Sequence, residues 1–189
     1  MSQYMWFFDQ ERCQQCRACT VACKDWNKVA LGPARWRRVS SPEEGIYPLI
    51  KVYNLSISCN HCDEPACIAA CPVGNIVKLE DNGLVLPLDK CISCKQCKAA
   101  CPYDAPQFAT MNPSELPMME KCTGCIDRLE KGMKPQCVMS CLTRALDFGP
   151  KEEILAKYGN VRQVKGGFAD PIHQQRRERD AHRALVAVD

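Results

Sequence analysis

The sequence has few aromatic residues, no long apolar run and no recognisable targeting segment. Phe, Trp and Tyr make up 7% of its 189 residues, and no apolar stretch approaches the roughly 20 residues that cross a bilayer. The first nine residues contain no basic region followed by an apolar core, no twin arginine and no cleavage site. We therefore expect no membrane span. We also expect a cytoplasmic chain, or one peripheral on a membrane within a complex, that is exported only with a signal-bearing partner.

Catalytic motifs are lacking as well. There is no glycine-rich loop that would cradle a phosphate, and no nucleophile is arranged with a base. Histidine is scarce, and both His173 and His182 are distant from any cysteine, so we expect them at the surface. The chain is therefore not expected to be an enzyme on its own.

Cysteine, in contrast, is abundant, at sixteen of 189 residues. Disulfide frameworks scatter their cysteines across loops, which disfavours disulfides here. Zinc ribbons use two separated C-x2-C pairs and have no use for a third cysteine two residues later, which disfavours zinc. The cysteines form four groups of four: Cys13, Cys16, Cys19 and Cys23; Cys59, Cys62, Cys67 and Cys71; Cys91, Cys94, Cys97 and Cys101; and Cys122, Cys125, Cys137 and Cys141.

The third group has the spacing C-x2-C-x2-C-x3-C-P, from Cys91 to Pro102, which holds a [4Fe–4S] cluster in bacterial ferredoxins. Three of its thiolates would hold one cluster, and the fourth would ligate a neighbouring cluster. The other groups vary this spacing, with longer loops in the second and fourth groups and with Lys24 and Leu142 in the place of proline. The sequence thus predicts four [4Fe–4S] clusters with no cysteine left over, held by groups that work in pairs.

The formal net charge of +3 and the sequence pI of about 8.1 count every cysteine as neutral. Metal-bound thiols are deprotonated, and four oxidised clusters of about −2 each would bring the charge to about −5. The basic pI is therefore no argument for nucleic-acid binding, and we expect no nucleic-acid partner. Because buried clusters would replace much of a hydrophobic core, their removal should unfold the chain.

Short strands are expected between the cysteine groups. The aromatic run at residues 4–8 and the loosely alternating residues 49–57 favour strands. Asn82-Gly83 between two apolar runs predicts a hairpin that joins the second and third groups. This hairpin is expected to cover the clusters with four apolar side chains: Ile76, Val77, Leu84 and Leu86.

The remaining segments favour short helices or loops. Helices that glycine closes are expected at residues 126–132 and 151–158, and another is expected to begin at Asp170-Pro171. Residues 24–48 contain several Gly and Pro breakers and predict an irregular insert. The fold class that follows is α+β, in a loop-rich chain with short hairpins and helices.

Basic side chains near the cysteines leave two interpretations open. In the insert, three arginines flank Trp36, which indicates either a docking patch or cation–π contact, or the solvated loop that we favour. Lysines beside ligands would either raise cluster potentials or lie at the surface with little effect. His61, in a group that already has four cysteines, is expected beside a cluster and not as its ligand. The arginines are Arg35, Arg37 and Arg38, and the lysines are Lys24, Lys95, Lys98 and Lys121.

Three stretches, together with the order of the groups, carry a family resemblance. They are the run from Ser56 to Cys62, Cys101-Pro102-Tyr103, and the run from Arg144 to Pro150. In these the chain resembles the iron–sulfur electron-transfer subunit of the dimethyl sulfoxide reductase family, with relatives in formate dehydrogenase, polysulfide reductase and nitrate reductase. The resemblance covers roughly residues 1–160, and the tail after Gly166 departs from it.

The resemblance implies a nested pairing of the second group with the third and of the first with the fourth. Two ferredoxin-like double-cubane modules would then consist of residues 49–111 and of residues 1–48 with 112–150, followed by a helical tail, 151–189, for partner contact. Because Cys94 and Cys97 are both present, no three-iron cluster is expected. The implied ligand sets are Cys59, Cys62, Cys67 and Cys101; Cys71, Cys91, Cys94 and Cys97; Cys13, Cys16, Cys19 and Cys141; and Cys23, Cys122, Cys125 and Cys137.

The same resemblance implies an electron relay. Single electrons would pass through the clusters to or from a large catalytic subunit that carries a molybdenum or tungsten bis-pterin, with a membrane anchor subunit or a soluble redox partner at the other end. A polyferredoxin subunit of a hydrogenase or related complex would have the same cysteine pattern. An alternative of another class is a structural or assembly protein that uses zinc or redox-silent clusters as folding staples.

Overall fold

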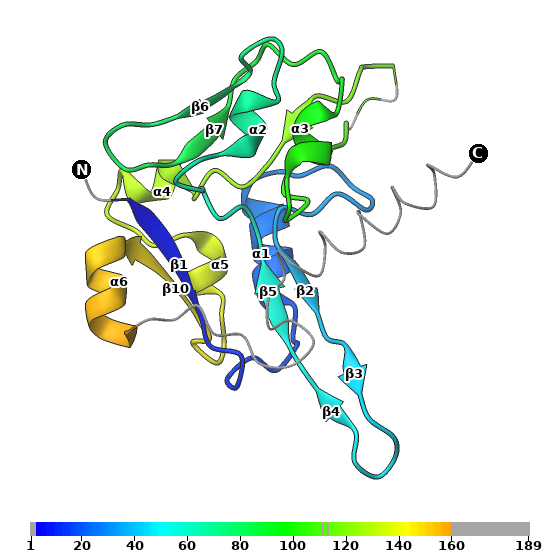
Figure 1. Cartoon of the computed structure of the whole chain (residues 1–189), viewed down its shortest axis with the longest axis vertical. Coiled ribbons are helices and arrows are strands. Elements are labelled where there is room, and N and C mark those ends of the chain that lie inside the picture. Colours follow the sequence, from blue (N-terminus) through cyan, green and yellow to red (C-terminus); the bar gives the residue numbers. More distant parts are fainter. Residues whose placement is uncertain (1–2, 111, 113, 160–189) are drawn as a thin grey trace.

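The computed structural model describes residues 3–110, 112 and 114–159. Its elements are short and are separated by the cysteine loops (Figure 1), in agreement with the α+β chain expected. The helix α1 continues through Cys23, because lysine follows that cysteine, whereas α2 and α3 end before a Cys-Pro pair. The helices are α1 (Ala18–Trp26), α2 (Ala66–Ala69), α3 (Gln96–Ala100), α4 (Ile126–Leu129), α5 (Gln136–Met139) and α6 (Lys151–Tyr158).

The strands of the described residues form antiparallel pairs, each a separate two-stranded sheet. The predicted hairpin at Asn82-Gly83 is confirmed as the pair β6 and β7. The expected helix at 126–132 is confirmed but ends at Leu129, and Gly132 closes the following turn with a φ of +69°. The pairs are β1 (Tyr4–Phe8) with β10 (Leu146–Pro150), β2 (Arg38–Ser40) with β5 (Leu55–Ile57), β3 (Glu43–Glu44) with β4 (Lys51–Val52), β6 (Ile76–Lys78) with β7 (Val85–Pro87), and β8 (Gln107–Phe108) with β9 (Met119–Glu120).

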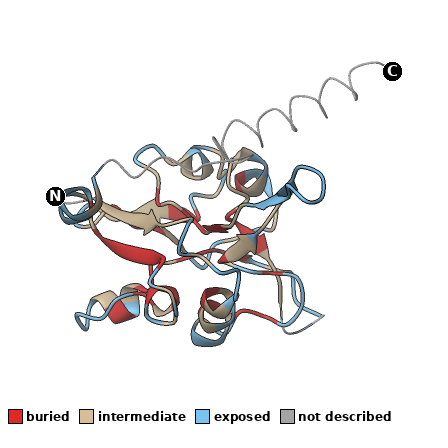
Figure 2. Cartoon of the chain, turned by 90° about the horizontal axis from the view of Figure 1, so that it is seen from below, coloured by how far each residue is buried: buried red, intermediate tan, exposed pale blue. Residues whose placement is uncertain are grey.

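The strand pair β1 and β10 joins distant parts of the chain and builds the main core. Tyr4 lies opposite Pro150 in the register, and the aromatic rings of Tyr4 and Trp6 lie 5.3 and 4.3 Å from that of Phe148. Phe148 and Leu84 are buried, the latter completely. Figure 2 shows the buried residues along the middle of the molecule and the exposed loops around them. The hydrophobic core thus lies under β10, between the cysteine loops.

The helix expected at residues 151–158 is confirmed as α6, which lies against β1 and β10 (Figure 1). The ring of Tyr158 stacks on that of Phe7 at 3.7 Å, and its hydroxyl donates a hydrogen bond to the buried carboxylate of Asp147. The helix expected at Asp170-Pro171 and the rest of the predicted tail lie outside the described residues.

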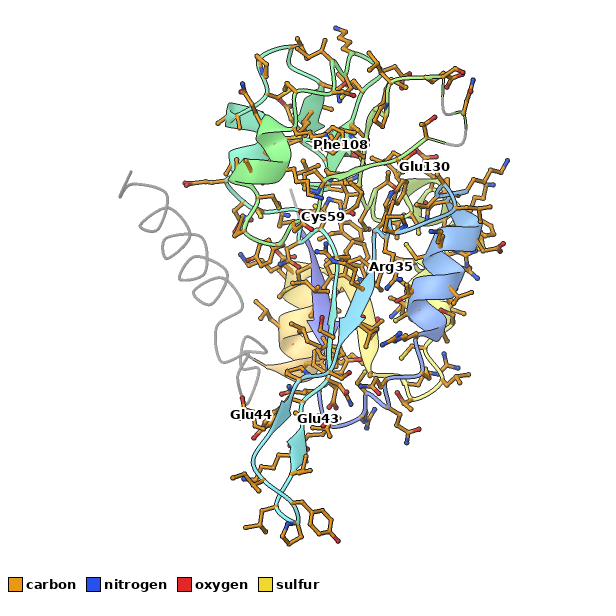
Figure 3. The ribbon with its side chains drawn as sticks, turned by 90° about the vertical axis from the view of Figure 1, so that its right-hand side faces the viewer. Arg35, Glu43, Glu44, Cys59, Phe108 and Glu130 are labelled. Carbon is orange, nitrogen blue, oxygen red and sulfur yellow. The ribbon has the colours of Figure 1, made fainter. Side chains whose placement is uncertain are left out.

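A long ribbon corrects the expectation of an irregular insert. Residues 38–44 contain β2 and β3, which pair with β5 and β4, so the expected strand at 49–57 is divided in two. The ribbon projects from the body of the molecule in Figure 1, with Glu43 and Glu44 on its outer part in Figure 3. Of the breakers in the insert, Ser41-Pro42 lies between β2 and β3, and Gly45 follows β3 at the exposed tip. The local pattern could not indicate strands whose partners follow several residues later.

The hairpin of β6 and β7 covers part of the cysteine region as expected. Ile76 and Leu84 are 2% and 0% exposed, whereas Val77 and Leu86 are half-buried. Within the described part of the chain, no helix is long and apolar enough to cross a membrane.

Candidate metal centres

The sixteen cysteines are free thiols, and the cavities they line and their electrostatic interactions divide them into four sets. In every set three thiols come from one group and the fourth comes from another, so each set joins two segments distant in sequence. The proximity of the members is evident from their electrostatic interaction: after burial, the charges of other cysteines of the same set contribute to the raised pKa of Cys13, Cys23, Cys62, Cys67 and Cys97. The structure therefore brings together all of the cysteines that the sequence singled out.

Two of the sets line cavities whose walls include residues of α2, α3 and the hairpin of β6 and β7. One cavity is lined by Cys59, Cys62 and Cys67 of the second group and by Cys101 of the third, together with apolar side chains and Lys121. The other is lined by Cys71 of the second group and by Cys91, Cys94 and Cys97 of the third, together with Ile76, Phe108 and Met119. The second and third groups thus exchange their fourth cysteines.

The other two sets lie among α1, α5 and the core. Cys13 interacts with Cys16, Cys19 and Cys141. Cys23 interacts with Cys122, Cys125 and Cys137. The helix α1 contains Cys23, and α5 ends just before Cys141. Because these two helices pack against each other, Cys23 lies with the thiols of the fourth group and Cys141 with those of the first.

Burial makes these thiols poor acids without a cation. Desolvation by burial is the main cause that raises the pKa of Cys67, Cys97 and Cys122 to about 11, and the charges of nearby thiols add to it, although the charge of Lys121 acts in the opposite direction on Cys67. The pKa of Cys23 is raised further by its own burial and by the neighbouring thiols. Four thiolates can therefore share one of these sites only around a cationic centre, which is the condition that an iron–sulfur core satisfies.

Across the residues that the structure describes, no group of three or more His, Cys, Asp or Glu side chains is arranged to hold a single metal ion.

The backbone of each loop turns amides towards the first thiol. The residue two positions after the first cysteine has a positive φ in every group, which directs its N–H inward. In three groups the N–H lies 3.4–3.5 Å from the Sγ atom, as from His61 to Cys59 and from Gly124 to Cys122. Such bonds favour the thiolate and stabilise a charged centre. The residues are Gln15, His61, Ser93 and Gly124.

A second amide contacts the last thiol of three groups. The N–H four residues after that cysteine lies 3.2–3.4 Å from its sulfur, as from Ala145 to Cys141. Leu142 replaces proline there without changing this turn, since Arg144 has a φ of +55°. In the first group α1 continues past Cys23, so the Asn27 side chain contacts the sulfur instead, at 3.7 Å. Where Lys24 replaces the proline, the group that donates to the last sulfur is therefore a side-chain amide and not a backbone N–H.

His61 is a buried support of its loop. It is 1% exposed, and its Nδ1 accepts a hydrogen bond of 2.9 Å from the Val85 backbone. Burial and the charge of Lys121 lower its pKa well below the usual value, so it is neutral. These contacts agree with its expected place beside a cluster.

One buried and one half-buried arginine were not expected. The solvated loop favoured for the arginines is wrong for Arg37, which is 2% exposed and lies over the Trp6 ring, 4.2 Å from its centroid. It is also wrong for Arg38, which pairs with Asp104 at 3.0 Å. Both arginines find their partners in distant segments, and no local pattern indicates this. Of the two interpretations that the sequence left open for these side chains, cation–π contact holds, although with a different tryptophan.

The four lysines that lie next to cysteines in the sequence also differ in their burial and contacts. Lys95 is exposed, Lys98 pairs with Asp104, and Lys24 donates to backbone carbonyls of the insert. Lys121 is 0% exposed, and its Nζ lies 3.3 Å from Cys59 Sγ. Only a lysine so placed can act on a thiolate without the screening of solvent.

Comparison with known proteins shows which families and relatives this chain is similar to. The family described as 4Fe-4S dicluster domain matches residues 50–151, and the 4Fe-4S binding domain matches residues 10–26. The chain is 43% identical over 172 residues to YnfG of Escherichia coli (strain K12), a probable anaerobic dimethyl sulfoxide reductase component, and the match covers 86% of this chain and 81% of that protein.

The chain is also similar in sequence to relatives whose names contain other substrates. The chain is 34% identical over 189 residues to a subunit of the sulfite dehydrogenase of Allochromatium vinosum, with 89% of this chain and 77% of that protein covered. It is 37% identical over 155 residues to the thiosulfate reductase electron transfer subunit PhsB of Salmonella typhi, with 80% and 78% covered.

Proposed function

Because the protein belongs to the family of 4Fe-4S iron–sulfur subunits that includes those of the anaerobic dimethyl sulfoxide reductases, we propose that it relays single electrons through four [4Fe–4S] clusters. The relatives are named as electron-transfer or iron–sulfur subunits of enzyme complexes, and the chain is such a non-catalytic subunit. The number of clusters and the identity of the catalytic partner are the parts of this assignment that we propose.

The exchange of the fourth cysteine between groups is the observation that supports four clusters. It gives four sets of four thiols, with backbone amides or a side-chain amide directed at sulfur. We propose that the sets are the ligand sets implied by the resemblance, and that the second and third groups form one module, residues 49–111, and the first and fourth groups the other, residues 1–48 with 112–150. Each cluster, when bound, would take up and release one electron.

The residues of the chain hold the centres and control their surroundings. The hairpin of β6 and β7 and the β10 strand exclude water from the buried sides, and the inward amides stabilise negative charge on the sulfurs. No bond to substrate is formed or broken in this chain. The reaction belongs to a partner, which we propose is a molybdenum or tungsten bis-pterin subunit, with a membrane anchor subunit or a soluble redox partner as the other contact.

Anaerobic isolation of the tagged chain from its native cell tests this function. Iron and acid-labile sulfide near sixteen each per chain, or about four of each per cubane, are expected, together with a large partner that contains molybdenum or tungsten. A nickel–iron partner would instead favour the hydrogenase polyferredoxin. Zinc in place of iron, or clusters that no physiological donor reduces, would overturn the electron relay and favour a structural protein.

A further inference from the structure

The ammonium group of Lys121 lies where the two halves of the cysteine arrangement meet. Its side chain is completely buried. The Nζ atom lies 3.3 Å from Cys59 Sγ and 3.1 Å from the carbonyl oxygen of Cys122, and it also donates to the carbonyl of Val85. An ammonium has three hydrogens to donate and no acceptor, and all three of these partners accept. The geometry therefore fits a charged lysine.

The two cysteines at Lys121 belong to different sets. Cys59 and Cys122 nevertheless lie in one small buried cluster with Ala105. After burial, the charge of Cys59 contributes most to the raised pKa of Cys122. Figure 3 shows Cys59 at the centre of the molecule, between its upper and lower parts. This contact is thus a junction between the sets of the two proposed modules.

With a cluster bound, the thiolate sulfurs that hold it would be the counter-charge of Lys121. The ion pairs within the described ranges involve other lysines and arginines. A buried charge without a partner costs several kcal/mol, so a buried lysine with no carboxylate needs another anion. Beside Cys59, the charge of Lys121 also favours the thiolates of Cys62 and Cys67.

We propose that Lys121 raises the reduction potential of the cluster that Cys59, Cys62, Cys67 and Cys101 hold, and so favours an electron at the junction between the modules. The inference rests on the proposed function, because it requires that cluster. Reduction adds negative charge, and a buried ammonium bonded to a ligand sulfur stabilises the reduced form more than the oxidised form. Lys121 touches no substrate and acts only through the cluster environment.

Redox titration of the cluster-loaded chain, followed by EPR, tests the proposal. In Lys121→Gln the ratio of reduced to oxidised cluster at a fixed potential should fall at least tenfold for one cluster, which corresponds to about 59 mV for a one-electron couple. Lys121→Arg, which keeps the charge, should remain near the unmodified chain. Lys95→Gln is the matched control, because Lys95 also adjoins a cysteine but is exposed. Equal shifts in Lys121→Gln and Lys95→Gln would overturn the proposal.

A measurement on the unmodified chain covers the case in which Lys121 variants fail to hold clusters. Cells are supplied with lysine labelled with ¹⁵N at Nζ only, and the reduced chain is measured by pulsed EPR. One cluster should show a ¹⁵N coupling, and its absence from all reduced clusters would overturn the proposal. Iron and sulfide analysis of the same sample separates the two hypotheses, because a chain without clusters contradicts the proposed function instead.

Discussion

Arg37 lies over the ring of Trp6, with its guanidinium carbon 4.2 Å from the ring centroid, and the indole N–H of Trp6 donates to the carbonyl of Cys59 at 3.0 Å. The guanidinium also donates to the hydroxyls of Ser56 and Ser58, at 3.2 and 2.8 Å. This network joins β1, the start of β2 and the segment that leads into the second cysteine group. It also places a buried positive charge beside thiols of two sets, since burial acts to lower the pKa of Arg37 but the charges of these thiols outweigh it and raise that pKa.

Arg37→Met should therefore destabilise the cluster-loaded chain. Removal of one charge from a buried network leaves its anionic partners uncompensated, which costs about 3–5 kcal/mol. The apparent melting temperature under anaerobic conditions should fall by roughly 6–20 °C. Arg35→Met is the control, because Arg35 is exposed and a surface substitution changes stability by only about 0.5 kcal/mol. Equal melting temperatures for the two variants would contradict the role of the network.

Cys97→Ser tests the proposed ligand sets. Cys97 is buried in the cavity with Cys71, Cys91 and Cys94, so its loss should remove one cluster or convert it to another type. Iron and sulfide should fall to about three quarters of the unmodified content if the cluster is lost. The control is Ile92→Ala in the same loop, whose side chain is exposed. Retention of four unchanged clusters in Cys97→Ser would rule out this ligand assignment.

Gly124→Ala should disturb the loop of the fourth group. Gly124 has a φ of +70°, and a Cβ atom there would lie 3.0 Å from Leu84 Cδ2, with Phe148 also close. The left-handed backbone costs a residue with a side chain about 1–2 kcal/mol, and overpacking adds about 1–3 kcal/mol. We expect a lower melting temperature and less iron per chain.

Gly132→Ala separates these two contributions. Gly132 has a φ of +69°, but its Cβ position has no atom of the described chain within 4 Å. It should therefore show the backbone cost alone. If the two alanine variants lose the same stability, then the contact between the loop and Leu84 contributes nothing.

Asp147→Asn should release α6 from the core. Burial raises the pKa of Asp147, but the hydrogen bonds from Lys134, Tyr158 and Lys157 outweigh this and lower it well below its usual value. Loss of charged hydrogen bonds should reduce the free energy of unfolding by about 1–3 kcal/mol at pH 7. Exposed Asp89, changed to Asn, is the control.

The pH dependence of this effect has a defined sign. Because the folded-state pKa of Asp147 is depressed, its contribution is complete above the unfolded pKa of about 3.9 and is lost as the pH falls below it. The difference in melting temperature between Asp147→Asn and the unmodified chain should therefore be constant from about pH 8 to about pH 5. A difference that disappears already near pH 6 would mean that another group titrates.

The cysteine pattern allowed the sequence to predict much of the site. Ligand spacing is a local property, and so are the turn at Asn82-Gly83 and the glycine that closes α6. The turn and the helix end agree with the structure because each depends on residues only a few positions apart. The meeting of Cys23 with the fourth group, in contrast, could be expected only from the family resemblance.

The burial of two basic residues could not be predicted from the local sequence. Arg37 and Lys121 are buried because their partners come from other segments, at Ser56 and Ser58 for the first and at Cys59 and Val85 for the second. A charge in a sequence is most often a solvated one, and only tertiary contacts overrule that expectation. The ribbon was missed for the same reason, since Glu43 and Glu44 have poor strand propensity and depend on β4 for pairing.

The proposed crossing of Cys141 to the ligand set of the first group would also determine when that set can be completed. Protein synthesis adds about 5–20 residues per second, so roughly 6–26 s pass between the appearance of Cys13 and that of Cys141. Cys101, in contrast, follows Cys59 after about 2–8 s at the same rate. The nascent chain must therefore carry three unpaired thiols of the first group, open to oxidation, while later segments are still being made.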